Sequence, residues 1–530
     1  MSAFQKLVEH SKKVSNFGHL ASIVGWDQAA VMPSGGAEAR SNAMAELNVH
    51  IHSLMTQPHL GDLFARAEEE SLSTQDQAVL REMKRDWQQA NLLPESLVQA
   101  QSLAGSKCEH AWRSQRGNDD WAGFEKNWAE VVKLSQEEAQ IRAEAAGTSP
   151  YDAMLELYEP GTTSASLDVL FTDVKTWLPS MIDEAIEKQK ANNILLPNGH
   201  YPAEKQKALG LEVMKLLQFD FEHGRLDESV HPFCGGVPTD VRITTRYDEK
   251  EFVQSLMGIV HETGHARYEQ GLPKSLAGTT AGEARSMGIH ESQSLFFEMQ
   301  VGRSQAFVEH LARLASNHFE GPEFAQDNLS KIYTHVEKGF IRVDADELTY
   351  PAHVILRYEI ERDLMNGVIK HTDVPELWNE KMKAYLGLST EGNFKNGCMQ
   401  DIHWTESECT VNNYRDGCLQ DIHWTQSKCT VHNYKDGCLQ DIHWTQGAFG
   451  YFPSYTLGAM YAAQFMAAMK KTVDVDGAIR SGDLSPIFNW LSTNIWSKGS
   501  LLTTDTLVKQ ATGETLNANY FKEHLRGRYL

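Results

Sequence analysis

The five residues from His261 to His265 read HExxH, and this spacing constrains the fold because it brings the two histidines together only on a helix. Residues i and i+4 lie on the same helix face, so both imidazoles can bind one cation. Neutral imidazole suits Zn²⁺, and a catalytic zinc keeps three protein ligands and one exchangeable position. The alternative is a pair of solvated histidines on a surface helix, because a chain with 22 histidines can contain this motif by chance.

The residues around this motif predict that its helix is partly buried. Between residues 252 and 260 the apolar side chains recur at helical spacing, and Gly271 followed by Pro273 gives an ordinary stop signal. Buried imidazoles need polar partners, and a metal ion supplies them. This context favours a metal site over solvated histidines.

The third ligand is expected on a second helix that returns past the first, and residues 288–299 have the pattern of such a helix. Glu291 is preferred to Glu283 and Glu298 because its neighbours place it just inside that helix. Two neutral imidazoles and one carboxylate leave a zinc site with a charge of about +1, which lowers the pKa of a bound water toward ~7. Glu262 cannot reach the metal that its flanking histidines bind, so we expect it to be the base that accepts the proton of this water.

The composition limits the class of protein. The 530 residues carry a formal net charge of −22, which argues against nucleic acid or an anionic membrane surface as a partner. Lys12 and Lys13 are not followed by the apolar segment of a secretion signal, and no stretch approaches the ~20 apolar residues of a membrane span. Five of the seven cysteines lie in one repeated tract, unlike a secreted disulfide framework. We therefore expect a soluble cytoplasmic protein.

The apolar periodicity predicts a mainly α-helical fold. No Gly/Ser-rich linker divides the chain, so residues 1–530 are expected to form a single domain, a continuous helical body around an active-site groove. The main strand candidate is 241–246, and a strand that leads into a metal-binding helix suggests a small β-sheet edging the site. Amphipathic helices are predicted at 4–24, 37–56, 74–90, 120–146, 166–190 and 203–218.

Several longer motifs accompany HExxH. They are Trp26-Asp27-Gln28 with Met32-Pro33, His231-Pro232-Phe233, Asp240 to Thr244, His290 to Ser294, Ile341 to Tyr350 and a Gly-x-x-Gln-Asp-x-His-Trp element. Motifs of this length in the right order are far more specific than HExxH alone. Together they resemble those of the thermostable metallocarboxypeptidases of the Taq type, and the resemblance covers nearly the whole chain.

The resemblance implies a mainly α-helical gluzincin fold with a deep active-site groove, usually as a homodimer. It implies an enzyme that releases single amino acids from peptide C-termini with broad specificity, so its partners would be peptides with a free C-terminus. It also implies that His261, His265 and Glu291 are the metal ligands and that Glu262 is the base. The implied cofactor is Zn²⁺, with Co²⁺ as an alternative.

Recognition of a free α-carboxylate by so acidic a protein requires local guanidinium groups, which bind carboxylates through two parallel hydrogen bonds. Arg242 and Arg342 are the arginines within the resembling motifs, and we expect one or both to bind the substrate terminus. The alternative is that Arg242 pairs with Asp240, and Arg342 with Asp344 or Glu347, to brace the groove.

A hydrogen-bond donor for the oxyanion of the tetrahedral intermediate is also required. Tyr451, Tyr455 and a histidine of the Gln-Asp-Ile-His-Trp sequence are the candidates. We expect His443 and Tyr455 to act in catalysis, and Asp441 and Tyr451 to contact substrate. The alternative is that both tyrosines are plain core residues.

The element that contains this histidine occurs three times, at 397–404, 417–424 and 437–444, with a period of 20 residues. The resembling family has it once, so the tract 393–446 is interpreted as a triplication that inserts about 40 residues into a normal enzyme. A solenoid is the alternative, but the repeats lack a ladder of leucine-like core residues.

Only one copy can occupy one site, and the third runs directly into the segment that contains Tyr451 and Tyr455. We therefore expect Gln440, Asp441, His443 and Trp444 in the groove. The cysteines and histidines of the tract could instead hold a structural metal, but their spacing is not that of standard zinc sites. A disulfide between the second cysteines of two repeats, Cys409 and Cys429, is disfavoured in a reducing compartment.

Two other functions compete with a zinc carboxypeptidase. An oligopeptidase or endopeptidase of related fold would cut within peptides and would have no use for a carboxylate-binding pair such as Arg242 and Arg342. A binding protein with an impaired catalytic site could use the repeated tract to recruit a partner. The intact set of metal ligands and base argues against this second alternative.

Overall fold

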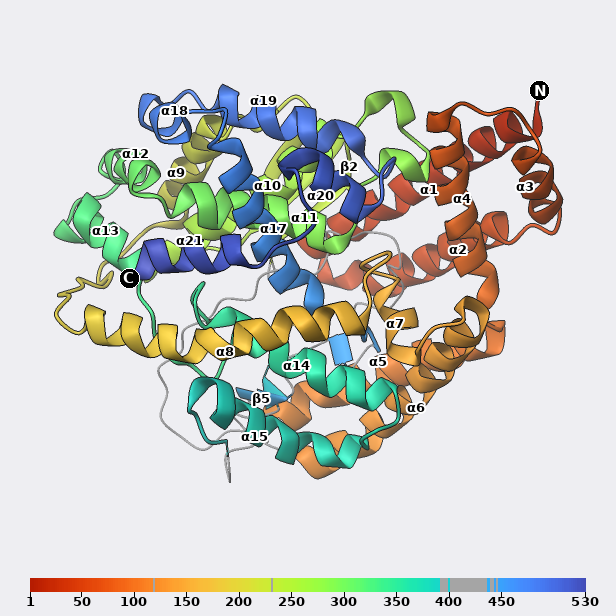
Figure 1. Cartoon of the computed structure of the whole chain (residues 1–530), viewed down its shortest axis with the longest axis horizontal. Coiled ribbons are helices and arrows are strands. Elements are labelled where there is room, and N and C mark those ends of the chain that lie inside the picture. The colour runs from red at the N-terminus through yellow and green to blue at the C-terminus, as the bar shows by residue number, and fades with distance from the viewer. Residues whose placement is uncertain (118–119, 230–231, 391–398, 401–435, 439–442, 445–446) are drawn as a thin grey trace.

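The computed structural model of the chain is mainly α-helical, as predicted (Figure 1). It describes residues 1–117, 120–229, 232–390, 399–400, 436–438, 443–444 and 447–530. Of the residues predicted in the groove, Gln440 and Asp441 lie outside this set, as do His231 of one resembling motif and most of the first two copies of the repeated element.

The six helices predicted from apolar periodicity are all present. Ser73 caps the start of the third of them and Thr163 that of the fifth, and each accepts a hydrogen bond from the backbone N–H three residues on. The six are α1 (Ala3–Ala30), α2 (Ala37–Met55), α4 (Thr74–Leu92), α6 (Trp121–Ala146), α8 (Ser164–Gln189) and α9 (Ala203–Leu216).

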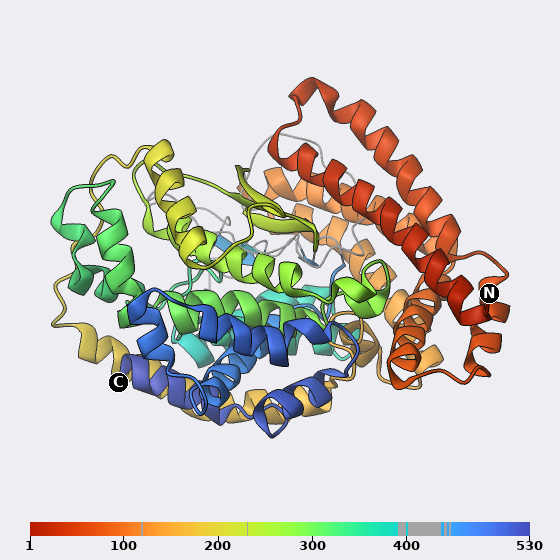
Figure 2. The same ribbon diagram turned by 90° about the horizontal axis from the view of Figure 1, so that it is seen from above.

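The first helices gather at the N-terminal end of the molecule (Figures 1 and 2). In Figure 2, α1 and α2 run side by side as a helical hairpin, and α3 (Leu60–Glu68) packs with α4. Apart from the four central helices described below, the other α-helices are α5 (Glu95–Gly117), α7 (Pro150–Leu155), α12 (Gln305–Ala315), α13 (Gln326–Tyr333), α15 (Val374–Leu386), α18 (Val475–Ser481), α19 (Ser485–Asn494), α20 (Thr504–Thr512) and α21 (Asn519–Tyr529). Within the described part of the chain, no helix is both long and apolar enough to span a membrane.

The predicted strand is the central strand of a three-stranded sheet. The order is β1-β3-β2, with β3 (Asp240–Thr245) parallel to β1 (Gly224–Glu228) and antiparallel to β2 (Phe233–Val237). Val241 and Ile243 of β3 are buried and pack with Ile259 of the following helix. The predicted small sheet beside the HExxH helix is therefore confirmed. A short pair, β4 (Met399–Gln400) and β5 (Asp436–Cys438), lies in the repeated tract.

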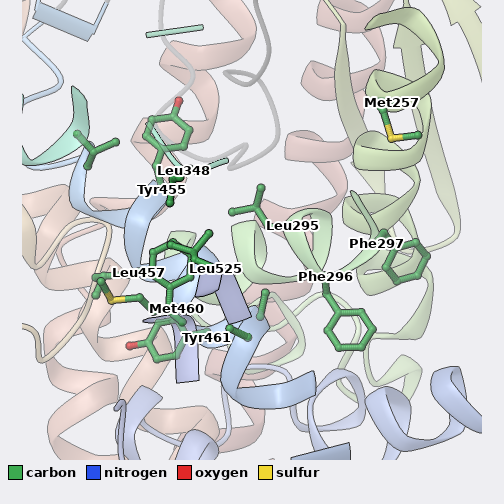
Figure 3. Packing of buried hydrophobic residues seen from close by; sticks show 14 of the residues in the cluster. Met257, Leu295, Phe296, Phe297, Leu348, Tyr455, Leu457, Met460, Tyr461 and Leu525 are labelled. Atoms are coloured by element: carbon green, nitrogen blue, oxygen red, sulfur yellow. The ribbon is translucent and has the colours of Figure 1, made fainter. Parts of the chain in front are cut away.

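Four helical segments form the centre of the molecule, and their side chains are buried on nearly all sides. Figure 3 shows apolar residues of three of these segments, Met257, Leu295 to Phe297 and Tyr455 to Tyr461, among the packed side chains. The segments are α10 (Val253–Gly271), α11 (Met287–Leu295) with its π-helical continuation η4 (Phe296–Gly302), α14 (Tyr350–Met365) and α17 (Pro453–Met469).

Candidate metal centre

The HExxH residues lie in the middle of α10. The side chains of His261, Glu262 and His265 are all buried. His261 and His265 are 3% and 4% exposed, and Glu262 between them is 1% exposed. The two imidazole rings lie on one helix face with their centroids 4.9 Å apart. Burial of both rings excludes the alternative of two solvated histidines on a surface helix.

Glu291 on α11 faces both imidazoles. Its Oε2 lies 3.5 Å from Nε2 of His265 and 4.0 Å from Nε2 of His261. Among the described residues, this is the group of metal-ligand side chains whose ligand atoms lie within 4.8 Å of one another. Ligand atoms of a tetrahedral zinc, with bonds of about 2.0–2.2 Å, are separated by roughly 3.3–3.5 Å. Small side-chain adjustments would therefore let the three groups bind one ion.

Two glycines allow the helices to approach closely enough for this geometry. A methyl group at Gly264 of α10 would lie 2.6 Å from the carbonyl oxygen of Gln293 and from Cα of Ser294 on α11. A methyl group at Gly458 of α17 would lie 2.7 Å from Cγ of Glu291 itself. Since real Cβ atoms do not approach this closely, glycine at both positions sets the place of Glu291.

His261 is supported by a carboxylate. Its Nδ1 lies 2.9 Å from Oε2 of Glu298 on η4, and Arg303 donates to Oε1 of the same carboxylate at 2.6 Å. Burial raises the pKa of Glu298, but Arg303 and the hydrogen bond from His261 outweigh it and hold that pKa below its ordinary value. With Nδ1 engaged, the buried Nε2 of His261 has no hydrogen-bond partner among the described residues and faces Glu291. This donor set fits a bound metal.

His265 is supported by a second histidine. Its Nδ1 lies 2.6 Å from Nδ1 of His290, and Nε2 of His290 lies 2.9 Å from Oε1 of Glu269. Burial, together with the neighbouring His290 and His261, holds the pKa of His265 well below its ordinary value. The imidazole is therefore neutral at physiological pH, which is the form that binds metal.

The supporting roles of Glu298, Arg303, His290 and Glu269 were not predicted from the sequence. Glu298 was considered only as a third ligand, and His290 only as part of a motif. A usable signal existed for Glu269, which follows His265 by one helical turn on the same face of α10. The role of Arg303 depends on the π-helical turn, which has no clear sequence signal.

The two predicted carboxylate-binding arginines lie in different surroundings. On β3, Arg242 donates to both oxygens of Asp240 at 2.9 Å, and its guanidinium lies over the ring of Trp26 at 4.4 Å. This is the bracing arrangement considered for Arg242. Arg342 is buried and donates to the hydroxyl of Tyr350 at 2.8 Å.

Aromatic rings surround the Arg342 guanidinium. Its Cζ lies 5.1 Å from the ring centroid of Tyr455, 5.4 Å from that of Phe452 and 5.8 Å from that of Tyr350. Glu347, an alternative partner for Arg342, instead accepts hydrogen bonds from His524, Arg528 and Tyr529 on α21. Tyr455, beside Arg342, and Gly458, which packs against Glu291, lie one turn apart on α17. This helix therefore connects the surroundings of Arg342 to Glu291.

The third copy of the repeated element contributes two described side chains to this region. The His443 ring stacks on Tyr451 at 5.1 Å and also contacts Phe452 and Tyr455. Tyr451 and Tyr455 are themselves buried.

Trp444, next to His443, is fixed at both its side chain and its backbone. Its indole N–H donates to Glu361 of α14 at 2.7 Å, and its carbonyl accepts from the indole of Trp128 at 3.1 Å. The rings of Trp444 and Trp128 are stacked. Of the three copies, the third therefore has its histidine and tryptophan packed within the described structure.

Sequence comparison identifies the family. The family described as Carboxypeptidase Taq (M32) metallopeptidase matches residues 6–409 and 428–529, which leaves only part of the repeated tract unmatched inside these limits. Thermostable carboxypeptidase 1 of Thermus thermophilus is 34% identical over 542 aligned positions that cover 100% of this chain and 98% of that protein. Carboxypeptidase 1 of Bacillus subtilis is 32% identical, over 98% of this chain and 96% of that protein.

Solved structures agree with this result over the whole chain. Metallocarboxypeptidase 1 of Trypanosoma cruzi superposes with a TM-score of 0.90 at 44% identity, covering 99% of each chain. A carboxypeptidase of Pyrococcus furiosus superposes with a TM-score of 0.88 at 29% identity, covering 100% of this chain and 99% of that one. The chain thus belongs to the Carboxypeptidase Taq (M32) metallopeptidase family and is a metallocarboxypeptidase.

Proposed function

We propose that this metallocarboxypeptidase uses Zn²⁺ held by His261, His265 and Glu291 to release single residues from peptide C-termini with broad specificity. The observation that carries the proposal is the convergence of these three buried side chains, with ligand atoms within 4.8 Å of one another. Two imidazoles and one carboxylate with an open fourth position are typical of catalytic zinc in peptidases. Co²⁺ is the alternative metal, because the same nitrogen and oxygen ligands suit it.

A bound Zn²⁺ would supply a Lewis acid that polarises the scissile carbonyl and activates a water molecule. The remaining chemistry belongs to side chains. Glu262 lies between the two histidines on α10 and is buried beside them. We assign it the transfer of the proton from the attacking water to the leaving amine.

We assign the substrate carboxylate to Arg342. Its place beside Tyr455, which α17 connects to Glu291, supports this assignment. A substrate contact by Arg242 remains a prediction. The Arg242 guanidinium already pairs with Asp240, so a substrate carboxylate would have to share it with Asp240 or displace Asp240. A guanidinium binds a carboxylate through two parallel hydrogen bonds, and Asp240 already accepts two from Arg242.

Stabilisation of the oxyanion is proposed for His443 and Tyr455. Both are buried, belong to the same aromatic cluster and lie beside the Arg342 surroundings. Tyr451, stacked on His443, is proposed as a substrate contact. The same role is retained for Asp441, which lies outside the described residues.

Neither competing function is favoured by the comparisons, since the relatives reported above are named as carboxypeptidases. The proposed substrates are peptides with a free C-terminus. A homodimer remains an expectation from the resemblance, and a cytoplasmic location one from the composition.

The proposal is tested by replacing Glu262 with Gln, which keeps the shape of the side chain and removes the proton acceptor. We expect E262Q to retain one equivalent of metal by elemental analysis and to lose activity by at least about 10²–10⁴-fold, as is usual when a general base is removed. Replacement of the ligand His265 by Ala should instead lose the metal. Wild-type turnover in metal-loaded E262Q would contradict the assignment of the base.

A further inference from the structure

The two histidines of the HExxH motif have supporting groups of different kinds. Nδ1 of His261 faces a carboxylate, Glu298, whereas Nδ1 of His265 faces the ring nitrogen of another histidine, His290. A carboxylate can only accept a hydrogen bond, so it fixes the tautomer of His261 by itself. A neutral imidazole can donate or accept, so His290 fixes the tautomer of His265 only if its own tautomer is fixed.

Glu269 supplies that constraint. Its carboxylate oxygen lies 2.9 Å from Nε2 of His290, so this nitrogen carries the hydrogen and donates. Nδ1 of a neutral His290 is then an acceptor, and at 2.6 Å it takes the hydrogen on Nδ1 of His265. The lone pair of His265 is thereby placed on Nε2, the nitrogen that lies 3.5 Å from Glu291. The opposite set of tautomers would bring two acceptors face to face at Glu269.

The helices α10 and α11 hold His265, Glu269 and His290 close together, and packing restricts the rotation of the His290 ring. Glu269 lies one turn after His265 on α10, and His290 directly precedes Glu291 on α11. His290 is 2% exposed, and the ring of Tyr268 packs beside it with centroids 5.5 Å apart. The ring planes of His265 and His290 are inclined by 32° at a centroid distance of 4.6 Å. Packing thus leaves His290 little freedom to turn away.

We propose that His290 is a positioning residue for the metal centre, which, held by Glu269, presents Nε2 of His265 to the metal. This inference rests on the proposed function, because it requires a metal bound by His265. It assigns to the histidine beside the third ligand a role separate from that of the ligand itself. The competing explanation is that the two hydrogen bonds only join α10 to α11, and that the backbone of His290, which also makes a hydrogen bond with His265, orients this ring.

Asparagine and leucine at position 290 separate the two explanations, because these side chains have nearly the same shape. The amide oxygen of Asn can stand in the place of Nδ1 and accept from His265, whereas Leu offers no acceptor. We expect His290→Leu to weaken Zn²⁺ binding by about 10–100-fold, the usual effect of losing a group that supports a ligand. His290→Asn should remain within about threefold of the wild type, since the acceptor that orients His265 is kept.

Affinity is measured on the metal-free full chain by competition with a chromophoric zinc chelator. The visible absorption of the Co²⁺-loaded proteins provides a second signal, and it should change in H290L and not in H290N. His265→Ala is the reference for complete loss of the site. Equal zinc affinity in H290L and the wild type, with H265A much weaker, would overturn the role of His290 alone. Equal affinity in H265A and the wild type would overturn the metal centre, and this inference with it.

A second pair of variants covers the case in which H290L does not fold. Glu269→Gln keeps an oxygen that accepts from His290, and Glu269→Ala removes it. The inference predicts weaker zinc binding in E269A and nearly unchanged binding in E269Q, with equal melting temperatures for the two metal-free proteins. Equal zinc affinity in E269A and E269Q would overturn it.

Discussion

At the residue scale, Arg242 and Arg342, the two arginines proposed to bind a substrate carboxylate, have different surroundings. Arg242 already makes a two-point contact with Asp240 and lies against Trp26. Arg342 lies among the rings of Tyr350, Phe452 and Tyr455, in the part of the molecule that α17 joins to the metal ligands. A guanidinium can bind a carboxylate through two parallel hydrogen bonds, which is the contact proposed between Arg342 and the substrate terminus.

Arg342→Ala should therefore lower kcat/KM for free-acid peptides by about 30- to 1,000-fold, which corresponds to roughly 2–4 kcal/mol for a lost charge-assisted contact. The same change should have much less effect on C-terminally amidated peptides. Arg242→Ala is the comparison variant, and thermal stability is measured for both. An unchanged preference of R342A for free acids would contradict the assignment, and loss of that preference in R242A would transfer it to Arg242.

At the element scale, Glu291, the proposed third ligand, is positioned by helix contacts that only glycine permits. Gly264 and Gly458 let α10 and α17 approach α11 from two sides. Gly258, also buried on α10, has nothing within 4 Å of the place its Cβ would occupy. The two α10 glycines therefore allow a matched comparison.

Gly264→Ala should displace α11, since its new methyl group would lie 2.6 Å from backbone atoms of that helix. We expect a loss of about 1–3 kcal/mol in the free energy of unfolding from overpacking, together with weaker zinc binding. Gly258→Ala should be neutral or stabilise by up to about 1 kcal/mol through helix propensity. Chemical denaturation and zinc titration measure both effects. Equal behaviour of the two variants would contradict this account of the helix approach.

Glu159 joins the start of α11 to the start of α17. The backbone N–H of Gly288 and the hydroxyl of Ser454 both donate to its Oε1. Burial raises the pKa of this carboxyl from 4.5 to about 7, although these hydrogen bonds oppose the shift. Because the folded-state pKa is the higher one, the folded protein binds the proton more tightly than the unfolded chain. Stability is thus lost as pH rises from about 4.5 through about 7.

Glu159→Gln removes this titration. The stability of E159Q relative to the wild type should therefore increase by about 2.5 kcal/mol between pH 5 and pH 8, with the change centred below pH 7. Urea denaturation at several pH values measures it, and Glu130→Gln, on an exposed part of α6, is the control. A difference between E159Q and the wild type that does not vary with pH would show that Glu159 does not titrate in this range.

Sequence reasoning succeeded where the signal is local. Apolar periodicity located five of six long helices to within two residues and ended the first, α1, six residues too early, and HExxH with its neighbours identified the helix that carries the site. The short strands β1 and β2 were missed because one has little apolar alternation and the other contains Gly235 and Gly236. The pairing of Glu298 with His261, and of Trp26 with Arg242, depends on contacts between distant segments. No local pattern predicts such contacts.

At the scale of the whole molecule, the triplicated element is the feature that departs from an otherwise ordinary member of the family. His443 and Trp444 of the third copy are packed against α6, α14 and α17 by ring contacts and hydrogen bonds. These contacts support the prediction that the third copy is the working one. We continue to expect one domain with two additional copies inserted in a loop, since lengthening a loop changes its closure free energy only slowly.

Deletion of residues 397–436 joins Asn396 to the third copy and removes the first two, with β4 and the first residue of β5. We expect the shortened enzyme to keep kcat/KM within about threefold and its free energy of unfolding within about 1 kcal/mol. His443→Ala should reduce activity strongly in both the full and the shortened chain. In the full chain, His403→Ala and His423→Ala should stay near the wild type. Loss of activity on deletion, or in H403A instead of H443A, would show that another copy works.

The most direct measurement is a timed mass-spectrometric digest of one synthetic peptide in two forms, a free acid and a C-terminal amide. With the zinc-loaded enzyme, we predict a ladder of products that lose one residue at a time from the C-terminus of the free acid, and no ladder from the amide. The ladder should disappear when a chelator removes the metal and return when Zn²⁺ is restored. Internal cleavage, equal digestion of both forms, or a ladder that persists in the metal-free enzyme would contradict a zinc carboxypeptidase.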